Sequence, residues 1–204
     1  MTDTVTMVGA RSGRRMPLEL QAWTDDATAL ERDLVLSLPH PVLDVGCGPG
    51  RIAAALAARG VPALGIDASP SAVRAARRAG AVALCRSVFD PLPREGAWGA
   101  ALLFDGNVGI GGDPRRLLRR VRSLLRPGGV ALVEVEPPGH PSVRDRVRLC
   151  DGSGGAGPWF PWAWVGADAI DDLARASGFA GCTSSRHEGR WFARLHASKG
   201  AALT

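Results

Sequence analysis

The chain has 204 residues and a formal net charge of +5, from 25 lysines and arginines against 20 aspartates and glutamates. This length suits a single domain with a substantial core, and no apolar run approaches the roughly 20 residues that a membrane span needs. The first fifteen residues lack the apolar centre of a secretion signal, so we expect a cytoplasmic protein with no membrane partner. The four cysteines include no CxxC pair, which argues against both a disulfide framework and a zinc site.

Almost all of the basic charge comes from arginine, because Lys199 is the only lysine. The densest cluster is RRLLRRVRSLLR at 115–126, where Leu117, Leu118 and Val121 recur at helical spacing. The arginines between them would cover the opposite face of the same helix. No aromatic residues interleave with these arginines and no RNA-binding motif is visible. The pattern therefore favours a solvated helix face over a nucleic-acid site.

Residues 1–15 are polar, contain glycine and show no periodicity, which predicts an unstructured tail. Apolar residues between 17 and 38 fit helical segments. From residue 42 onwards, short apolar runs alternate with helical patterns, and Ser69 and Asp113 are expected N-caps because a proline follows each of them. The predicted strands are 42–45, 63–66, 81–85, 100–104 and 130–135, and the predicted helices are 51–59, one from 70 that stops at Gly80, and one from 114 to about 125.

The last part of the chain predicts a helix at 168–177 and then a hairpin, from two runs at 179–186 and 191–196 joined by HEGR. The earlier strands are continuous apolar runs, which is typical of a parallel sheet covered on both faces. The sequence thus predicts a doubly wound α/β fold with a mostly parallel seven-stranded sheet and a C-terminal antiparallel hairpin. One domain would span 16–197, followed by a short tail at 198–204.

One segment interrupts this alternation. Residues 137–165 are rich in proline and glycine and contain GPWFPWAW. A loop of this length in a compact domain is usually functional or disordered, and we expect it to form an insertion on the substrate side. Its aromatic residues fit an apolar substrate wall and structural packing under the loop equally well; they are Trp159, Phe160, Trp162 and Trp164.

The stretch VLDVGCGPGR at 42–51 places three glycines directly after the first predicted parallel strand. Ligands of open parallel sheets bind outside the carboxyl ends of the strands, and glycine lets them approach the backbone. Asp67 ends the next strand, near the separation at which a carboxylate meets ribose hydroxyls. Together these features predict an adenosine-containing ligand. The spacing is GxGxG, with Arg51 at the third glycine of the dinucleotide fingerprint, so the fit to NAD is poor.

VLDVGCGPGR and the following LGIDASP resemble motifs I and II of the class I S-adenosylmethionine-dependent methyltransferases. The resemblance continues through CRSVFDPLP, WGAALLFDGNVG and LLRRVRSLLRPGGVALVEV, and so covers about residues 42–136. It implies a Rossmann-like methyltransferase fold and S-adenosylmethionine as the cofactor, with S-adenosylhomocysteine as its product.

The resemblance also implies a role for each matching position. The turn from Gly46 to Gly50 would pass under the methionine part of the cofactor, Asp44 would position its amino group and Asp67 would bind the ribose. Ser87 stands where the family commonly has an acidic residue for the adenine. The implied cofactor-binding residues are Asp44, Gly46, Cys47, Gly48, Gly50, Asp67, Ala68, Ser87, Val88, Phe104 and Asp105.

The family's reaction is an in-line displacement, in which orientation of the two reactants does much of the work. After the fourth strand the chain reads FDGNVGIGGD instead of the NPPY or DPPY of amino-methylating members, and Asp105 and Asn107 alone do not make a metal site. We expect no metal. Candidate proton acceptors are His140 and Asp105, with Glu136 and His187 as further possibilities.

The first functional hypothesis is a methyltransferase acting on a small molecule, in specialised metabolism. A second gives the same enzyme RNA or a protein as its substrate. A third is a protein of this fold that binds S-adenosylmethionine without transferring its methyl group, either as a regulatory module or for another reaction.

Overall fold

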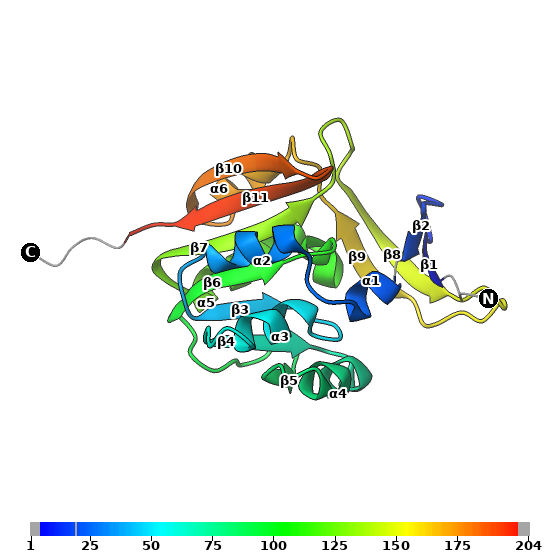
Figure 1. The fold of residues 1–204 in the computed structure, drawn as a ribbon. Coiled ribbons are helices and arrows are strands. Elements are labelled where there is room, and N and C mark those ends of the chain that lie inside the picture. Colours follow the sequence, from blue (N-terminus) through cyan, green and yellow to red (C-terminus); the bar gives the residue numbers. More distant parts are fainter. Residues whose placement is uncertain (1–4, 19, 200–204) are drawn as a thin grey trace, which may run out of the picture.

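The computed structural model describes residues 5–18 and 20–199, which form a large and a small sheet with helices (Figure 1). The large sheet has the strand order β10-β11-β7-β6-β3-β4-β5. Its strands are β3 (Val42–Val45), β4 (Ala63–Asp67), β5 (Ala83–Cys85), β6 (Trp98–Leu103), β7 (Leu125–Val135), β10 (Phe179–His187) and β11 (Arg190–Ala197). The helices are α1 (Leu20–Thr24), α2 (Ala29–Leu36), α3 (Arg51–Ala57), α4 (Pro70–Arg78), α5 (Pro114–Leu124) and α6 (Ile170–Ala176), with a 3₁₀ segment η1 (Asn107–Gly112).

The predicted sheet is confirmed. Strand β3 pairs in parallel with β4 and β6, β4 with β5, and β6 with β7, whereas β11 runs antiparallel to both β7 and β10. Strand β7 begins at Leu125, five residues earlier than predicted, because Leu125 already pairs with Trp98 before the RPGG turn. None of the helices in the described ranges is long and apolar enough to cross a membrane.

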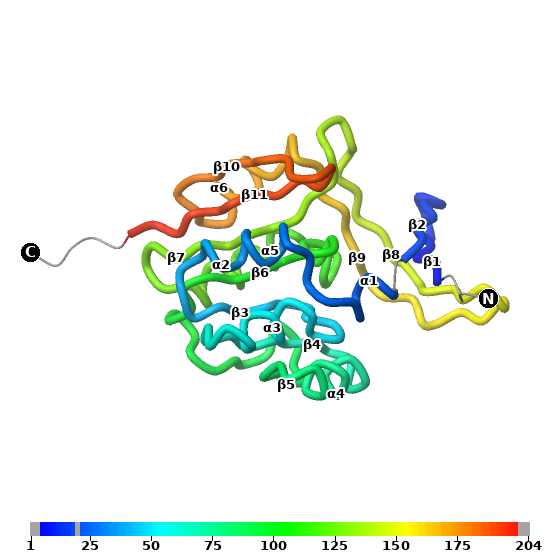
Figure 2. The backbone as a smooth tube through the Cα atoms, in the orientation of Figure 1, coloured from blue at the N-terminus to red at the C-terminus, as the bar shows by residue number. Residues whose placement is uncertain are grey.

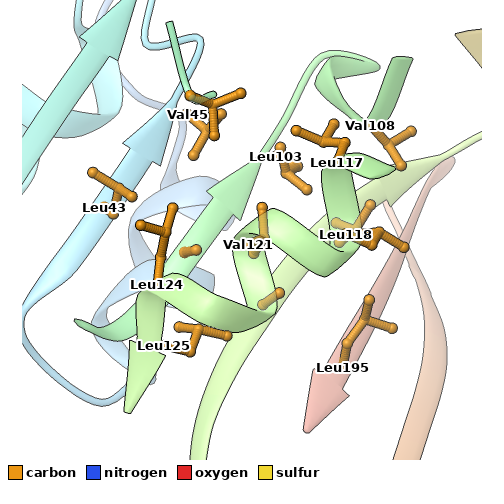
Figure 3. Packing of buried hydrophobic residues seen from close by; sticks show 14 of the residues in the cluster. Leu43, Val45, Leu103, Val108, Leu117, Leu118, Val121, Leu124, Leu125 and Leu195 are labelled. Carbon is orange, nitrogen blue, oxygen red and sulfur yellow. The ribbon is translucent and has the colours of Figure 1, made fainter. Parts of the chain in front are cut away.

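Both faces of the central strands β3, β6 and β7 are buried, which explains why these strands lack an alternating pattern. In β3, Leu43 and Val45 join the core that also holds the apolar face of α5, while Val42 joins the core under α2 and α3. Figure 3 shows how Leu117 and Val121 of α5 point toward the strands. The arginine-rich segment is therefore the amphipathic helix that its spacing predicts.

The predicted helix caps are also present. The Ser69 hydroxyl accepts a hydrogen bond from the Ala72 N–H, and the Asp113 carboxylate accepts one from the Arg116 N–H. In each helix a proline occupies the first turn, where its missing N–H costs no hydrogen bond. These local signals fix the starts of α4 and α5.

The small sheet was not predicted. It has the order β2-β1-β8-β9, all antiparallel, and consists of β1 (Val5–Gly9), β2 (Arg15–Leu18), β8 (Val143–Cys150) and β9 (Phe160–Trp164). The prediction of an unstructured tail at 1–15 is thus wrong for residues 5–9 and for residue 15, and the predicted loop 137–165 contains two strands. Residues 1–4, and 200–204 of the predicted C-terminal tail, lie outside the described residues.

The small sheet forms because two distant segments complete each other. Strand β1 pairs with β8, and the buried Asp145 of β8 accepts hydrogen bonds from the backbone N–H groups of Arg11 and Ser12 in the turn between β1 and β2. Figure 2 shows this N-terminal hairpin beside the segment 143–150. No local pattern reveals a pairing of this kind, because its partner lies more than 130 residues away.

Candidate active site

A cavity of about 680 Å³ lies between the carboxyl ends of the parallel strands and the small sheet. This volume is within the range of small-molecule and cofactor sites. Its floor comes from the residues that follow β3, β4, β5 and β6, and Phe160 and Trp162 of β9 line it from the small sheet. Of the predicted cofactor-binding residues, those that line the cavity are Gly46, Cys47, Gly48, Asp67, Ala68, Ser87, Val88 and Asp105.

The glycine turn after β3 is held open toward the cavity. Gly46 and Gly48 have left-handed φ angles of 73° and 53°, and a Cβ built on Gly48 would meet no atom within 4 Å. The Asn107 amide donates hydrogen bonds to the carbonyls of Val45 (3.0 Å) and Gly46 (2.9 Å). Asp67 accepts from the Gly48 N–H at 3.0 Å, so the two predicted motifs are in direct contact.

Gly50 has a different role from the one predicted. It does not line the cavity but forms the N-cap of α3, with φ 91°. A Cβ at this position would lie 2.6 Å from the Cβ of Ala76, which is closer than any real contact. The third glycine therefore allows α3 to begin and α4 to pack close to it.

Asp44 is buried below this turn, with 4% of its surface exposed, and does not line the cavity. Its Oδ2 atom has no hydrogen-bond partner among the described residues. Burial raises the pKa of this carboxyl from its ordinary value of 3.8 to about 7. An unpartnered buried acid beside a ligand cavity is a site at which a cationic group would be stabilised.

Five charged side chains form a cluster beside the cavity, which we call the ion-pair cluster: Glu31, Arg51, Asp105, Glu134 and Arg190. Arg51 pairs with Glu31 at 2.7 Å and with Asp105 at 2.9 Å. Arg190 pairs with Glu31 at 2.8 Å and with Glu134 at 2.7 Å. With three carboxylates and two guanidiniums, the cluster has one net negative charge.

Glu31 is the centre of the ion-pair cluster and is 1% exposed. Burial by itself would raise its pKa, but hydrogen bonds from Arg51, Arg190 and the Thr28 backbone outweigh burial and lower the pKa to about 2. The carboxylate is therefore ionised at neutral pH. Glu31 connects α2 to two elements beside the cavity, because it accepts hydrogen bonds from Arg51 of α3 and from Arg190 of β11.

Phe104 and Asp105 follow β6 but point to different places. The Phe104 side chain is 2% exposed and packs against Phe192, with ring centroids 5.3 Å apart, so its side chain does not line the cavity as predicted. Asp105 lines it, and has a left-handed φ of 55° although it is not glycine. Both of its carboxylate oxygens accept hydrogen bonds from Arg51. Backbone strain of this kind concentrates at functional sites.

The four predicted aromatic residues divide according to strand alternation. Phe160, Trp162 and Trp164 point to the inner side of the small sheet, where they pack with Met7 and Val147. Phe160 and Trp162 also line the cavity. Trp159 lies outside it, half-exposed, with the Arg148 guanidinium 4.8 Å from its ring. Phe160 and Trp162 therefore belong both to a satellite core and to the cavity wall, and their contact with a substrate stays a prediction.

The other candidate proton acceptors do not line this cavity. His140 is exposed in the turn after β7 and does not line it. His187 contacts Ser185 at 2.9 Å in the terminal hairpin, and Glu136 pairs with Arg14 at 2.7 Å. Cys47 does line the cavity, but burial raises the pKa of its thiol above the ordinary value, so the thiol is protonated at neutral pH.

Sequence reasoning missed several residues of the site. Trp23 lines the cavity from α1, and Asn107 holds the glycine turn from η1. Asn107 follows a predicted strand end, which is a signal that points to this edge of the sheet. Nothing in the sequence indicates Trp23, because it reaches the cavity only through the placement of α1.

Comparisons with known proteins agree with this arrangement. A family model described as a methyltransferase domain matches residues 42–129, and no curated protein matches the sequence significantly. A methyltransferase from Bacteroides fragilis, solved with S-adenosyl-L-homocysteine, is 21% identical with a TM-score of 0.75, over 97% of this chain and 89% of that one.

Two further solved structures share the fold. The 1,6-didemethyltoxoflavin-N1-methyltransferase of Burkholderia thailandensis is 20% identical with a TM-score of 0.60, over 88% of this chain and 82% of that one. A sugar N-methyltransferase from Streptoalloteichus sp. is 16% identical with a TM-score of 0.57, over 83% of this chain and 86% of that one.

Proposed function

We propose that this chain is a class I S-adenosylmethionine-dependent methyltransferase and that it transfers the methyl group to a small molecule bound under the small sheet. The observation that carries the proposal is the cavity of about 680 Å³, which joins the glycine turn and Asp67 on one side to Phe160 and Trp162 on the other. Two of the fold neighbours are described as acting on didemethyltoxoflavin and on a sugar, which are small molecules.

The residues present fit the cofactor. Asp67 presents its carboxylate to the cavity, where it would accept hydrogen bonds from the ribose hydroxyls. The unpartnered Asp44 matches an ammonium group such as that of the methionine part, and the missing side chain of Gly48 leaves open space at the glycine turn. Ala68 and Val88 line the cavity where they would contact the adenine.

When bound, S-adenosylmethionine supplies a methyl carbon made electrophilic by the attached sulfonium. The chain's own residues orient the reactants and exclude water, which in well-aligned systems contributes roughly 7–11 kcal/mol. Phe160 and Trp162 would exclude water from the acceptor side, since both line the cavity from the apolar face of the small sheet. We propose that no metal takes part and that the reaction belongs to specialised metabolism.

Incubation with methyl-labelled S-adenosylmethionine tests the proposal. The acceptors are a panel of small amines, phenols and thiols, with RNA in a parallel reaction, and both S-adenosylhomocysteine and the labelled product are measured. We expect label in at least one small acceptor. Labelling of RNA alone, weakened steeply by added salt, would establish the nucleic-acid alternative. Cofactor binding without S-adenosylhomocysteine, across all acceptors, would favour a protein that does not transfer the methyl group.

A further inference from the structure

A second cavity, of about 240 Å³, adjoins the first and shares Trp23, Asp105 and Trp162 with it. Its other walls come from the small sheet and from the end of β7. The glycine turn and Asp67 do not line it. On the proposed function, on which this inference rests, the second cavity therefore lies on the acceptor side of the site.

Among the described residues, the charged side chains that line this cavity are all acidic: Asp105, Glu134 and Glu136. Because an acidic cluster often serves only to balance neighbouring arginines, the pairing of each oxygen matters. Both Asp105 oxygens accept from Arg51, and both Glu134 oxygens accept from Arg190. Glu136 differs from these two residues, because only one of its carboxylate oxygens accepts a hydrogen bond from the described residues.

Arg14 donates to Oε2 of Glu136 at 2.7 Å, whereas Oε1 accepts no hydrogen bond from the described residues. Glu136 and Arg14 form a neutral pair of their own, so the charged side chains around the second cavity keep the one net negative charge of the ion-pair cluster. A ligand with one positive charge would balance it.

Trp164 gives an independent indication of a ligand. It lines the second cavity and is only 3% exposed, yet its Nε1 has no hydrogen-bond partner within the described part of the chain. Buried polar groups normally have a partner, because a buried donor without one loses the hydrogen bond that it makes to water in the unfolded chain. An unpaired donor and an unpaired carboxylate oxygen thus line one aromatic-walled cavity.

We propose that the second cavity binds the methyl acceptor and that the acceptor is a small amine, anchored by Glu136. The amine loses a proton to Glu136 or to water, and its lone pair forms the new bond to the methyl carbon. The electron pair of the broken sulfur–carbon bond stays on sulfur, so the positive charge moves from sulfur to nitrogen. Carboxylates favour this charge, whereas they would repel the alkoxide that a hydroxyl acceptor forms on losing its proton.

Matched probes test the proposal on the full chain saturated with S-adenosylhomocysteine. The probes are benzylamine with benzyl alcohol, and cyclohexylamine with cyclohexanol, and their affinities are measured by ligand-observed NMR. We expect each amine to bind at least fivefold more tightly than its alcohol, and Glu136→Gln to reduce that ratio below twofold. Amines that bind no more tightly than their alcohols, including the case in which neither binds, would overturn the proposal.

A second variant separates recognition from folding. Arg14→Gln removes the partner of Glu136 and should increase amine affinity at least twofold, while Glu136→Gln lowers it. If the ion pair only holds the N-terminal hairpin in place, both variants should lower the melting temperature and weaken both probes alike, which would refute the anchoring role. Asp172→Asn, at a side chain 92% exposed on α6, is the matched control and should change neither affinity.

Two further measurements test the methyltransferase function independently of the amine proposal. S-adenosylmethionine affinity is measured by calorimetry on the same samples, and transfer is measured with labelled cofactor. Transfer to hydroxyls but not to amines would refute the amine proposal and leave the methyltransferase function intact. If no acceptor receives a methyl group but the amines still bind more tightly than the alcohols, the methyltransferase function would be refuted and the amine site would stand.

Discussion

Replacing Asp44 with asparagine should make the cofactor-free protein more stable at pH 8, although the substitution removes a charge from the candidate site. Burial raises the pKa of Asp44 from 3.8 to about 7, so ionised Asp44 destabilises the folded state. Each unit of difference corresponds to about 1.4 kcal/mol, which gives a destabilisation of about 4 kcal/mol above pH 7. Asparagine has a similar shape and cannot ionise.

The pH dependence follows from the sign of this shift. Well below pH 3.8 the carboxyl is protonated in both states, and its ionisation contributes nothing to the free energy of unfolding. As the pH rises, the unfolded chain ionises first, and the destabilisation increases until the folded protein ionises near pH 7. The advantage of Asp44→Asn in the free energy of unfolding should therefore fall from about 4 kcal/mol at pH 8 to about 2 kcal/mol at pH 5.

Urea denaturation at pH 5 and pH 8 measures both values, and calorimetry measures the affinity for S-adenosylmethionine. The variant should bind the cofactor at least tenfold more weakly despite its greater stability, because the ammonium group loses an anionic partner. Asp172→Asn, at an exposed position, should stay within about 0.5 kcal/mol of the wild type at both pH values. A variant that is no more stable at pH 8, or equally stabilised at both pH values, would refute the reasoning.

Asp67→Ala should weaken S-adenosylmethionine binding at least tenfold, about 1.4 kcal/mol, by calorimetry; an unchanged affinity would contradict the ribose role. Gly50→Ala should lower the free energy of unfolding by about 2 kcal/mol or more, because of its φ of 91° and the contact with Ala76, whereas Gly60→Ala, with open space around it, should cost about 1 kcal/mol. Glu31→Gln should destabilise the protein by about 3–5 kcal/mol at neutral pH, since it removes the buried anion and leaves the half-buried Arg51 and Arg190 short of a partner. The pKa of Glu31 is about 2, so this loss should stay nearly constant from pH 5 to pH 8 and shrink only in strong acid.

The aromatic cluster shows how one segment serves both folding and the site. Phe160, Trp162 and Trp164 bury their side chains in the satellite core of the small sheet, and this burial stabilises the docking of the N-terminal hairpin. The same side chains line the two cavities. Substitutions here will therefore change stability and ligand affinity together, so the carboxylates provide the clearer tests of recognition.

The sequence by itself determined the large sheet and the glycine turn, because both depend on signals within a few residues. Continuous apolar runs predict strands that are buried on both faces, and serine or aspartate before proline predicts where α4 and α5 begin. The glycine turn and Asp67 lie together because parallel strands end at the same edge of a sheet, a rule that needs no knowledge of distant contacts.

Only the tertiary structure decided which residues surround the ligand cavities. Strand β1 forms by pairing with β8, and the local sequence of neither segment indicates that the other is its partner. Gly50 and Phe104 proved to be packing residues because Ala76 and Phe192, from other elements, occupy the space beside them. The ionisation of Asp44 and the ion-pair cluster depend on burial and on charges contributed from distant parts of the chain. Burial and electrostatic interaction are properties of distances in space, which the order of residues along the chain does not specify.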